Sequence, residues 1–157
     1  MPLKSAGILA YRKTNRTVEY FLVHNAGPYW DGKDHHAWSI PKGLFEDEEP
    51  LAAAIREFNE ETGQDITGEF FPLQPVRQSS GKIIYPYAVE ANPDADKVVS
   101  NTFTMEWPPN SGQIQEYPEV DMGGWFTFEV AKKKIMKGQI AILEELAGLI
   151  DNNQPGL

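Results

Sequence analysis

The segment Pro50–Thr62 constrains the fold most, because it has a clear helix signal and two different faces. A proline suits the first turn of a helix, the alanine run that follows favours helix, and Gly63 suits the C-terminal cap. Four residues recur at spacings of four, three and four and should form an apolar stripe: Leu51, Ile55, Phe58 and Thr62. The chain must therefore supply a core against which this helix packs.

Short apolar segments on both sides of this helix predict a β-sheet. Ser5–Arg12 and Thr17–His24 are rich in residues that favour strands, and the polar turn Lys13–Arg16 between them indicates a hairpin. Further strands are expected over five segments: Ala37–Ile40, Glu69–Val76, Lys82–Val89, Asn101–Trp107 and Val120–Phe128.

Other segments predict the helices and loops that complete the chain. Two C-terminal helices are expected, Phe128–Met136 and Gln139–Ile150, with a break at Gly138. Polar residues, Gly and Pro indicate loops or turns over Asn25–His36, Gly43–Glu48, Ala91–Val99 and Pro108–Pro118. Mixed strands with helices before and after them predict an α/β or α+β sandwich.

Length and composition fit one domain over residues 1–157. The absence of cysteine excludes disulfides, thiolate nucleophiles and cysteine-ligated metal centres. We identify no signal peptide and no membrane-spanning stretch, so we expect a cytoplasmic protein. The formal net charge of −9 makes nucleic acid an unfavourable partner. The oligomeric state is left open.

Much of this negative charge is concentrated in and before the predicted helix. From Glu46 to Glu61 there are seven acids and one base, Arg56. Glu57, Glu60 and Glu61 share one helix face, because residues three and four apart are neighbours on a helix. Most acidic helix faces are simply solvated. However, like charges at these spacings cost roughly 0.2–0.5 kcal/mol per pair.

A bound cation would turn this repulsion into attraction. Carboxylate oxygens are suitable ligands for hard divalent ions, so the cluster favours Mg²⁺ or Mn²⁺ over zinc. A structural Ca²⁺ site is an alternative, but the sequence lacks the D-x-D-x-D-G loop pattern that would support it. The three histidines, His24, His35 and His36, lie in or beside a loop without metal-ligand spacing, and we expect them to be solvated.

The stretch from Pro41 to Gly63 resembles the Nudix box, the signature motif of the Nudix hydrolases. The motif runs Gly, five residues, Glu, seven residues, and then Arg-Glu-apolar-x-Glu-Glu-x-Gly-apolar. The sequence departs from it twice: one residue fewer separates Gly43 from Glu48, and Gln64 follows Gly63 where the family prefers an apolar residue. The matching positions are Gly43, Glu48, Arg56, Glu57, Phe58, Glu60, Glu61 and Gly63.

The resemblance implies a Nudix-type α/β/α sandwich with a mixed sheet between helices. It also implies a metal site built from Glu57, Glu60, Glu61 and the Lys42 main-chain carbonyl, with Mg²⁺ or Mn²⁺ as the ion. Gly43 would permit close approach of the backbone to the metal. Two further residues have implied roles: Arg56 would pair with Glu48 and hold the loop against the helix.

The same resemblance implies hydrolysis of a nucleoside diphosphate linked to another group. Members differ in their general base, and we favour Glu60 or Glu61, with Glu119 as a substitute. Glu119 stands six residues before Trp125, like the late glutamate of many members, and Glu116 competes for this role.

Substrate binding is expected near the box and in the loop before it. Trp30 is the best candidate to stack on a base, and Lys33, the Lys42 side chain and Gly43 are candidates to meet phosphate. The opening Pro41-Lys42-Gly43 is similar to that of diadenosine polyphosphate hydrolases. The alternative is a catalytically inactive Nudix-fold module or sensor that binds a nucleotide, although such members usually lose glutamates of the box.

Overall fold

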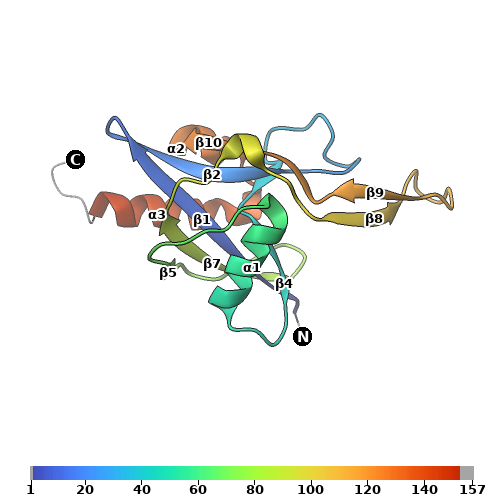
Figure 1. The fold of residues 1–157 in the computed structure, drawn as a ribbon, viewed down its shortest axis with the longest axis horizontal. Coiled ribbons are helices and arrows are strands. Elements are labelled where there is room, and N and C mark those ends of the chain that lie inside the picture. Colours follow the sequence, from blue (N-terminus) through green and yellow to red (C-terminus); the bar gives the residue numbers. More distant parts are fainter. Residues whose placement is uncertain (1, 153–157) are drawn as a thin grey trace.

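The computed structural model describes residues 2–152 as a mixed sheet with helices on both faces (Figure 1). The strand order is β10-β2-β1-β7-β5; β3, β4 and β6 pair with β2, β1 and β7, and β8 and β9 form a separate sheet. The strands are β1 (Lys4–Thr14), β2 (Thr17–Asn25), β3 (Trp38–Ser39), β4 (Lys42–Phe45), β5 (Phe71–Pro72), β6 (Val76–Arg77), β7 (Ile83–Glu90), β8 (Thr102–Glu106), β9 (Ile114–Pro118) and β10 (Val120–Thr127). The helices are α1 (Pro50–Thr62), α2 (Phe128–Lys134) and α3 (Ile140–Asn152), with the 3₁₀ turns η1 (Ala95–Lys97) and η2 (Lys137–Gln139).

The central strand β1 divides the core into two halves, because successive side chains of a strand point to opposite faces. Ile8 packs in the cluster beneath α1, which also contains Phe58. Leu9 packs in the opposite cluster, which contains Leu143 of α3. All four side chains are fully buried. The expected α/β/α sandwich with a mixed sheet is confirmed.

Helix α1 has the predicted bounds, but it is turned from the predicted orientation. Phe58 and Thr62 are buried as expected, whereas Leu51 and Ile55 are only half-buried and their places in the core are taken by Ala53 and Ala54. Alanine lets the helix axis come close to the sheet, and this closeness brings the glutamate face toward β4.

Several other elements differ from the prediction, because strands pair with segments far away in the sequence. The turn expected over Gly43–Glu48 begins with strand β4, which pairs with β1. Part of the loop expected over Pro108–Pro118 is β9, and the strand expected over Glu69–Val76 is two short pieces, β5 and β6. In each case the partner strand supplies hydrogen bonds that local sequence preference does not reveal.

The expectation of a solvated histidine was wrong for His24. Its side chain is 4% exposed, with ring nitrogens 2.8 Å from Asp121 Oδ1 and 2.5 Å from the Lys33 carbonyl oxygen. His24 is buried because it lies on β2 between strand β10 and the edge of the Trp38 ring. It thereby fastens the loop that follows β2 to the sheet.

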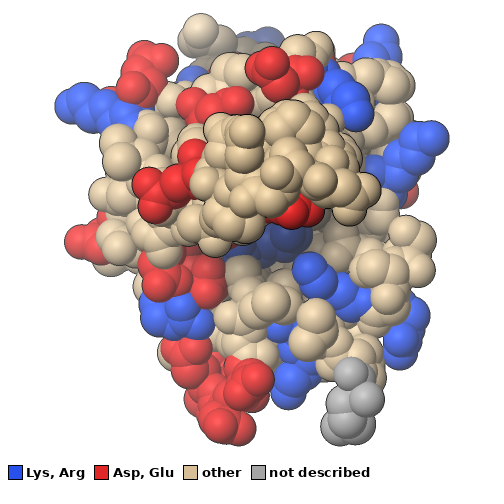
Figure 2. Space-filling view, turned by 90° about the vertical axis from the view of Figure 1, so that its right-hand side faces the viewer, with Lys and Arg blue, Asp and Glu red and all other residues tan. Residues whose placement is uncertain are grey.

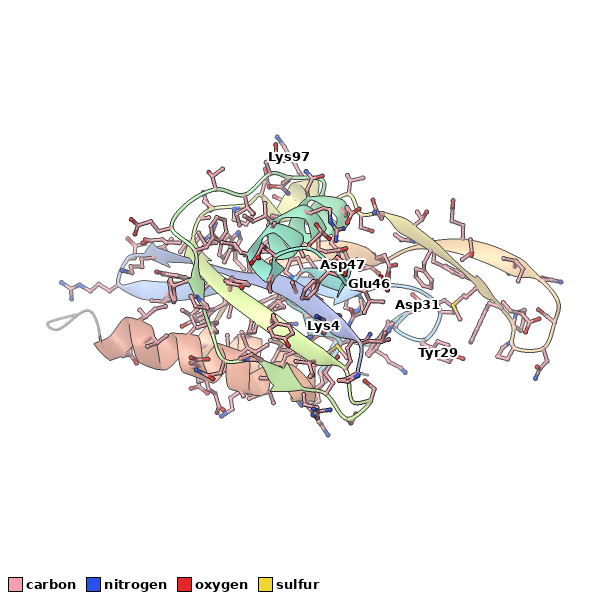
Figure 3. The ribbon with its side chains drawn as sticks, turned by 90° about the horizontal axis from the view of Figure 1, so that it is seen from below. Lys4, Tyr29, Asp31, Glu46, Asp47 and Lys97 are labelled. Carbon is pink, nitrogen blue, oxygen red and sulfur yellow. The ribbon has the colours of Figure 1, made fainter. Side chains whose placement is uncertain are left out.

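The hairpin β8–β9 projects from the body of the molecule (Figure 1). The loop after β2 packs along it: Phe103 of β8 lies against Gly27, and the rings of Tyr29 and of Trp107, which follows β8, meet edge to face with centroids 5.1 Å apart. Figure 3 shows Tyr29 in this loop, on the side of the molecule from which the hairpin projects. No helix among residues 2–152 is long and apolar enough to cross a membrane.

Candidate active site

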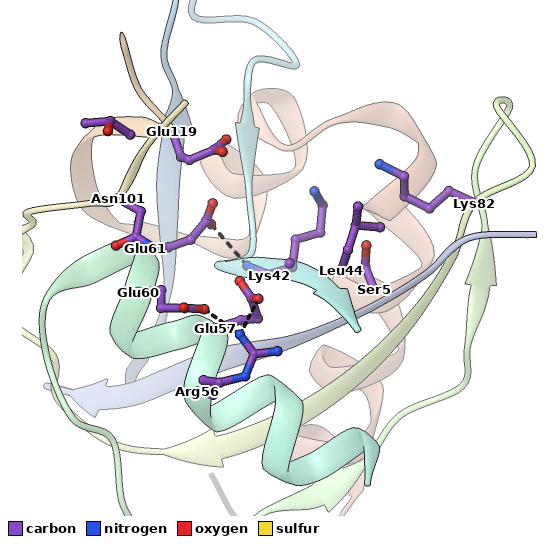
Figure 4. Close-up of a pocket in the computed structure, with 12 residues that line it drawn as sticks. Ser5, Lys42, Leu44, Arg56, Glu57, Glu60, Glu61, Lys82, Asn101 and Glu119 are labelled. Carbon is purple, nitrogen blue, oxygen red and sulfur yellow. Dashed lines mark hydrogen bonds and ion pairs between the residues drawn. The ribbon is translucent and has the colours of Figure 1, made fainter. Parts of the chain in front are cut away.

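A cavity of about 400 Å³ opens between α1, β4 and the root of the hairpin (Figure 4). Its walls come from segments far apart in sequence, which the parallel pairing of β1 with β7 and the return of β10 along β2 bring together. The residues that line it are Ser5, Lys42, Gly43, Leu44, Arg56, Glu57, Glu60, Glu61, Lys82, Asn101, Thr102 and Glu119.

Arg56 joins three carboxylates at one side of the cavity. Its Nη1 donates to Glu57 Oε1 at 2.7 Å and to Glu60 Oε2 at 2.6 Å. Its Nε and Nη2 donate to Glu48, at 2.9 Å and 2.5 Å for the shortest contacts, which ties the loop before α1 to the helix. The guanidinium holds the pKa of Glu48 below its usual value. The contact implied by the Nudix resemblance between Arg56 and Glu48 is therefore present.

Glu61 lies deeper in the cavity than Glu60. Its Oε1 accepts a hydrogen bond from the Lys42 main-chain N–H at 3.1 Å. Burial raises the pKa of Glu61 to about 7, and the carboxylates of Glu119 and Glu57 add to this shift against the opposing effect of Lys42. Burial likewise raises the pKa of Glu57, and Glu60 contributes. In both groups, therefore, burial disfavours the ionised carboxylate.

Gly43 lies directly against the carboxyl group of Glu57. A β-carbon at this position would collide with the Glu57 carboxyl group. The spacing of the box thus has a steric basis here, because the shortened loop still brings a glycine opposite the first helix glutamate. A larger residue would displace the Glu57 carboxyl group from this position.

Glu119 and Glu116, the two candidates for the late glutamate, lie in different places. Glu119 lines the cavity at the junction of β9 and β10. Glu116 lies on the hairpin, where its Oε2 accepts a hydrogen bond from Thr102 Oγ1 at 3.1 Å. Glu119 therefore shares the cavity with the helix glutamates.

Two lysines line the cavity opposite the helix carboxylates (Figure 4). Lys42 is on β4 and Lys82 precedes β7. Burial lowers the pKa of Lys42, against the raising effect of Glu61, and the nearby Lys82 lowers it further. Viewed from the hairpin end, the hollow beneath the projecting hairpin contains basic atoms (Figure 2).

Some binding residues predicted from the sequence lie elsewhere. Trp30 packs against the core cluster beneath α3, and the Lys33 Nζ is 6.0 Å from the centre of its ring. Neither residue lines the cavity. The sequence singled out none of Ser5, Asn101 or Thr102 as a cavity residue, because only strand register brings them there.

The donor chemistry of the cavity suits a hard divalent cation. Glu57, Glu60, Glu61 and Glu119 supply only carboxylate oxygens, the ligand type that such ions prefer. Among residues 2–152 no three acidic or imidazole groups form a preformed cluster, and the Arg56 guanidinium bridges Glu57 and Glu60. The residues thus fit a metal site in which Arg56 is the immediate neighbour of the ligands.

Comparison with known proteins shows the family to which the chain belongs. The family model described as the NUDIX domain matches residues 1–146. The chain therefore belongs to the Nudix family of hydrolases, enzymes that generally use divalent metal ions. No curated protein matches the chain.

Solved structures show the same fold at low sequence identity. An Ap4A hydrolase of C. elegans in a binary complex is 22% identical, with a TM-score of 0.65 over 96% of this chain and 98% of that one. The NUDIX domain of Shewanella oneidensis NrtR complexed with ADP ribose is 14% identical, with a TM-score of 0.64 over 96% of this chain and 89% of that one. A Nudix hydrolase from Listeria monocytogenes, described as putative in its own report, is 18% identical, with a TM-score of 0.64 over 95% and 94%.

Proposed function

We propose that this chain is a Mg²⁺- or Mn²⁺-dependent pyrophosphohydrolase that cuts a nucleoside diphosphate linked to another group. The observation that carries the proposal is one cavity with carboxylates on one wall and two lysines on the other. A pyrophosphate is an anion that carboxylates repel, so the two lysines give the substrate a favourable place to bind. The carboxylates then serve the metal and the attacking water.

The metal ligands in this proposal are Glu57, Glu60 and Glu61, with the Lys42 main-chain carbonyl. A divalent cation bound there would neutralise phosphate charge and lower the pKa of a water molecule. The ammonium groups of Lys42 and Lys82 would bind phosphate oxygens and orient the linkage. Arg56 would hold the carboxylates of Glu57 and Glu60 in place through the hydrogen bonds that its Nη1 donates to both.

The hydrolytic step needs a base at the same place. The water oxygen forms a bond to phosphorus, the bridging oxygen departs with its electron pair, and a carboxylate takes the proton of the water. Glu60, Glu61 and Glu119 all line the cavity and are candidates for this base. Arg56 already donates to Glu60, which leaves Glu61 and Glu119 with fewer competing contacts.

Dinucleoside polyphosphates are the substrates we favour. A long phosphate chain would use both lysines, and the Pro41-Lys42-Gly43 opening is similar to that of diadenosine polyphosphate hydrolases. The fold similarity to an Ap4A hydrolase supports the choice of probe, and the similarity to an ADP-ribose complex makes ADP-ribose the necessary competitor.

A substrate panel tests this proposal. We expect diadenosine tetra- to hexaphosphates to give a higher kcat/KM than ATP, nucleotide sugars or ADP-ribose at fixed Mg²⁺, with products separated by chromatography. Excess chelator should abolish turnover, and added Mg²⁺ or Mn²⁺ should restore it. Faster cleavage of ADP-ribose would reject the substrate choice but keep the mechanism. Tight binding of every probe without cleavage would instead favour a nucleotide sensor.

The role of the cavity lysines in substrate binding can be tested separately. Lys82→Gln should raise KM for diadenosine tetraphosphate severalfold, since one charge-assisted phosphate contact is worth about 1.5–3 kcal/mol before solvent screening. Lys97→Gln is the matched control, because Lys97 lies on η1, outside the cavity (Figure 3). Equal KM values for the two variants would remove Lys82 from the proposed substrate site.

A further inference from the structure

Three residues before the hairpin connect helix α1 to Glu119, at the junction of β9 and β10. The Val99 N–H donates to the Thr62 carbonyl at 2.9 Å, and the Asn101 N–H donates to the Glu60 carbonyl at 2.8 Å. The Asn101 carbonyl in turn accepts from the Glu119 N–H at 2.8 Å. The segment 99–101 therefore sets the distance between the helix glutamates and Glu119.

The side chain of Ser100 completes this connection. Its Oγ accepts from the Val120 N–H at 3.2 Å and lies 3.0 Å from the Val120 carbonyl oxygen, to which it can donate. The Asn101 carbonyl, at 2.8 Å, is the other acceptor within reach of the hydroxyl. One hydroxyl thus contacts both main-chain groups of the residue that follows Glu119.

Glu119 itself has few other restraints. The Ala26 N–H donates to its carbonyl at 3.1 Å, but among residues 2–152 no side chain donates a hydrogen bond to its carboxylate. Val120 is buried, whereas Glu119 is exposed to the cavity. The direction of the carboxylate therefore depends on how firmly the main chain at 119–120 is held.

We propose that Ser100 is a positioning residue that fixes the Glu119 carboxylate relative to the carboxylates of α1. The inference rests on the proposed hydrolysis and on the part that Glu119 plays in it. Without the hydroxyl, the Val120 N–H and carbonyl lose their side-chain partner, and the junction of β9 and β10 gains freedom beside the cavity. Glu119 then reaches its productive position in a smaller fraction of molecules.

A double-mutant cycle with diadenosine tetraphosphate and Mg²⁺ tests this role. Ser100→Ala should lower kcat about tenfold with little change in KM, since misplacing a catalytic group by about 1 Å can cost on the order of 100-fold. Ser100→Thr, which keeps the hydroxyl, should recover most of the activity. In a Glu119→Gln background, Ser100→Ala should have no further effect, because the group it positions is gone.

Ser111→Ala is the matched control, since the Ser111 hydroxyl accepts from the Gln113 N–H at the hairpin tip, at 3.1 Å, and has no other hydrogen bond among residues 2–152. A folded Ser100→Ala variant with full kcat would overturn the proposal. So would an equal loss with and without Glu119, which would show a merely structural role.

Amide hydrogen exchange measures how firmly Ser100 holds the main chain at residues 119–120, and this measurement does not depend on catalytic activity. Ser100→Ala should speed exchange at the Glu119 and Val120 amides and leave the strands β1 and β2 unchanged. Unchanged exchange at both amides would reject the restraint by Ser100 even if the enzyme is active. Absence of cleavage by the unmodified chain, with faster exchange in Ser100→Ala, would instead reject the proposed function and leave only the restraint.

Discussion

The polar groups on the two faces of the central sheet differ in charge and in how fully the protein satisfies them. Beneath α3, Gln139 is fully buried and neutral: its Oε1 accepts from the Ile40 N–H at 3.0 Å and its Nε2 donates to Ser39 Oγ at 2.9 Å. Beneath α1, the carboxyl groups of Glu57 and Glu61 are crowded, and burial raises the pKa of each. One face satisfies its polar groups internally, and the other leaves charge to be neutralised by something else.

This difference separates stability from function. A buried amide with complete hydrogen bonding costs little and fixes the packing of the elements around it. Crowded carboxylates destabilise the fold, and proteins retain such groups where activity needs them. We therefore expect substitutions on the α1 face to change turnover and substitutions on the α3 face to change stability.

The largest effect should come from the helix glutamates. Glu60→Gln and Glu61→Gln should each lower kcat on the order of 100-fold or more, because each removes metal charge or the base. Stability without metal should hold or rise, since a like-charge repulsion is relieved. Steady-state kinetics and thermal unfolding of the metal-free variants check both statements. Full activity of either folded variant would reduce that residue to a solvated surface charge.

The late glutamate should have the next largest effect. Glu119→Gln should lower kcat at least about tenfold, as a cavity carboxylate that can take a proton. Glu116→Gln is the matched control three residues away, on the hairpin and outside the cavity. Matched assays of the two variants decide the assignment. The opposite ranking would place the role on Glu116 and require the hairpin to close over the cavity.

The opposite face should respond in stability alone. Gln139→Leu keeps similar volume but leaves the Ile40 N–H without its acceptor, which should cost about 1–3 kcal/mol of unfolding free energy. The kcat of the folded fraction should not change. Urea unfolding and active-site-normalised kinetics measure the two quantities. A loss of kcat without a loss of stability would show that the faces are coupled.

The sequence was sufficient where a signal is local. Pro50 and Gly63 bounded α1 correctly, because the proline fits a first turn and the glycine adopts the left-handed cap with φ of 74°. The spacing of Glu57, Glu60 and Glu61 placed them on one face, because residues three and four apart are neighbours on a helix. The cavity that they share with Arg56 also needs β4 and the root of the hairpin, which no local signal places there.

The remaining features depend on contacts that composition does not reveal. The helix packs through Ala53 and Ala54 because small residues permit close approach to β1, whereas the hydrophobic pattern favoured Leu51 and Ile55. Lys82 enters the cavity through the parallel register of β7 with β1, and no local signal encodes that register. Roles in binding and catalysis at these positions stay predictions.

The smallest expected effect lies at the surface of the α2 side, on the loop after β2. Asp34 accepts from Lys134 Nζ at 2.7 Å and from Trp38 Nε1 at 2.9 Å, and these partners, Lys134 first, hold its pKa below the usual value. The Asp34 side chain is 65% exposed, so Asp34→Asn should lower the unfolding free energy by less than about 1 kcal/mol and leave kcat unchanged.

The pH dependence of this small effect has a definite sign. Because the folded-state pKa of Asp34 lies below its unfolded value, the ionised pair with Lys134 stabilises the fold above the unfolded pKa. That contribution falls as the pH drops through the folded pKa. The difference in unfolding free energy between the unmodified chain and Asp34→Asn should therefore be largest near neutral pH and shrink on acidification, as urea unfolding at several pH values would show. A difference that grows in acid would mean that Asp34 stabilises the loop through its protonated form. The contrast between a charged cavity face and a face of internally satisfied polar groups would then not extend to the loop after β2.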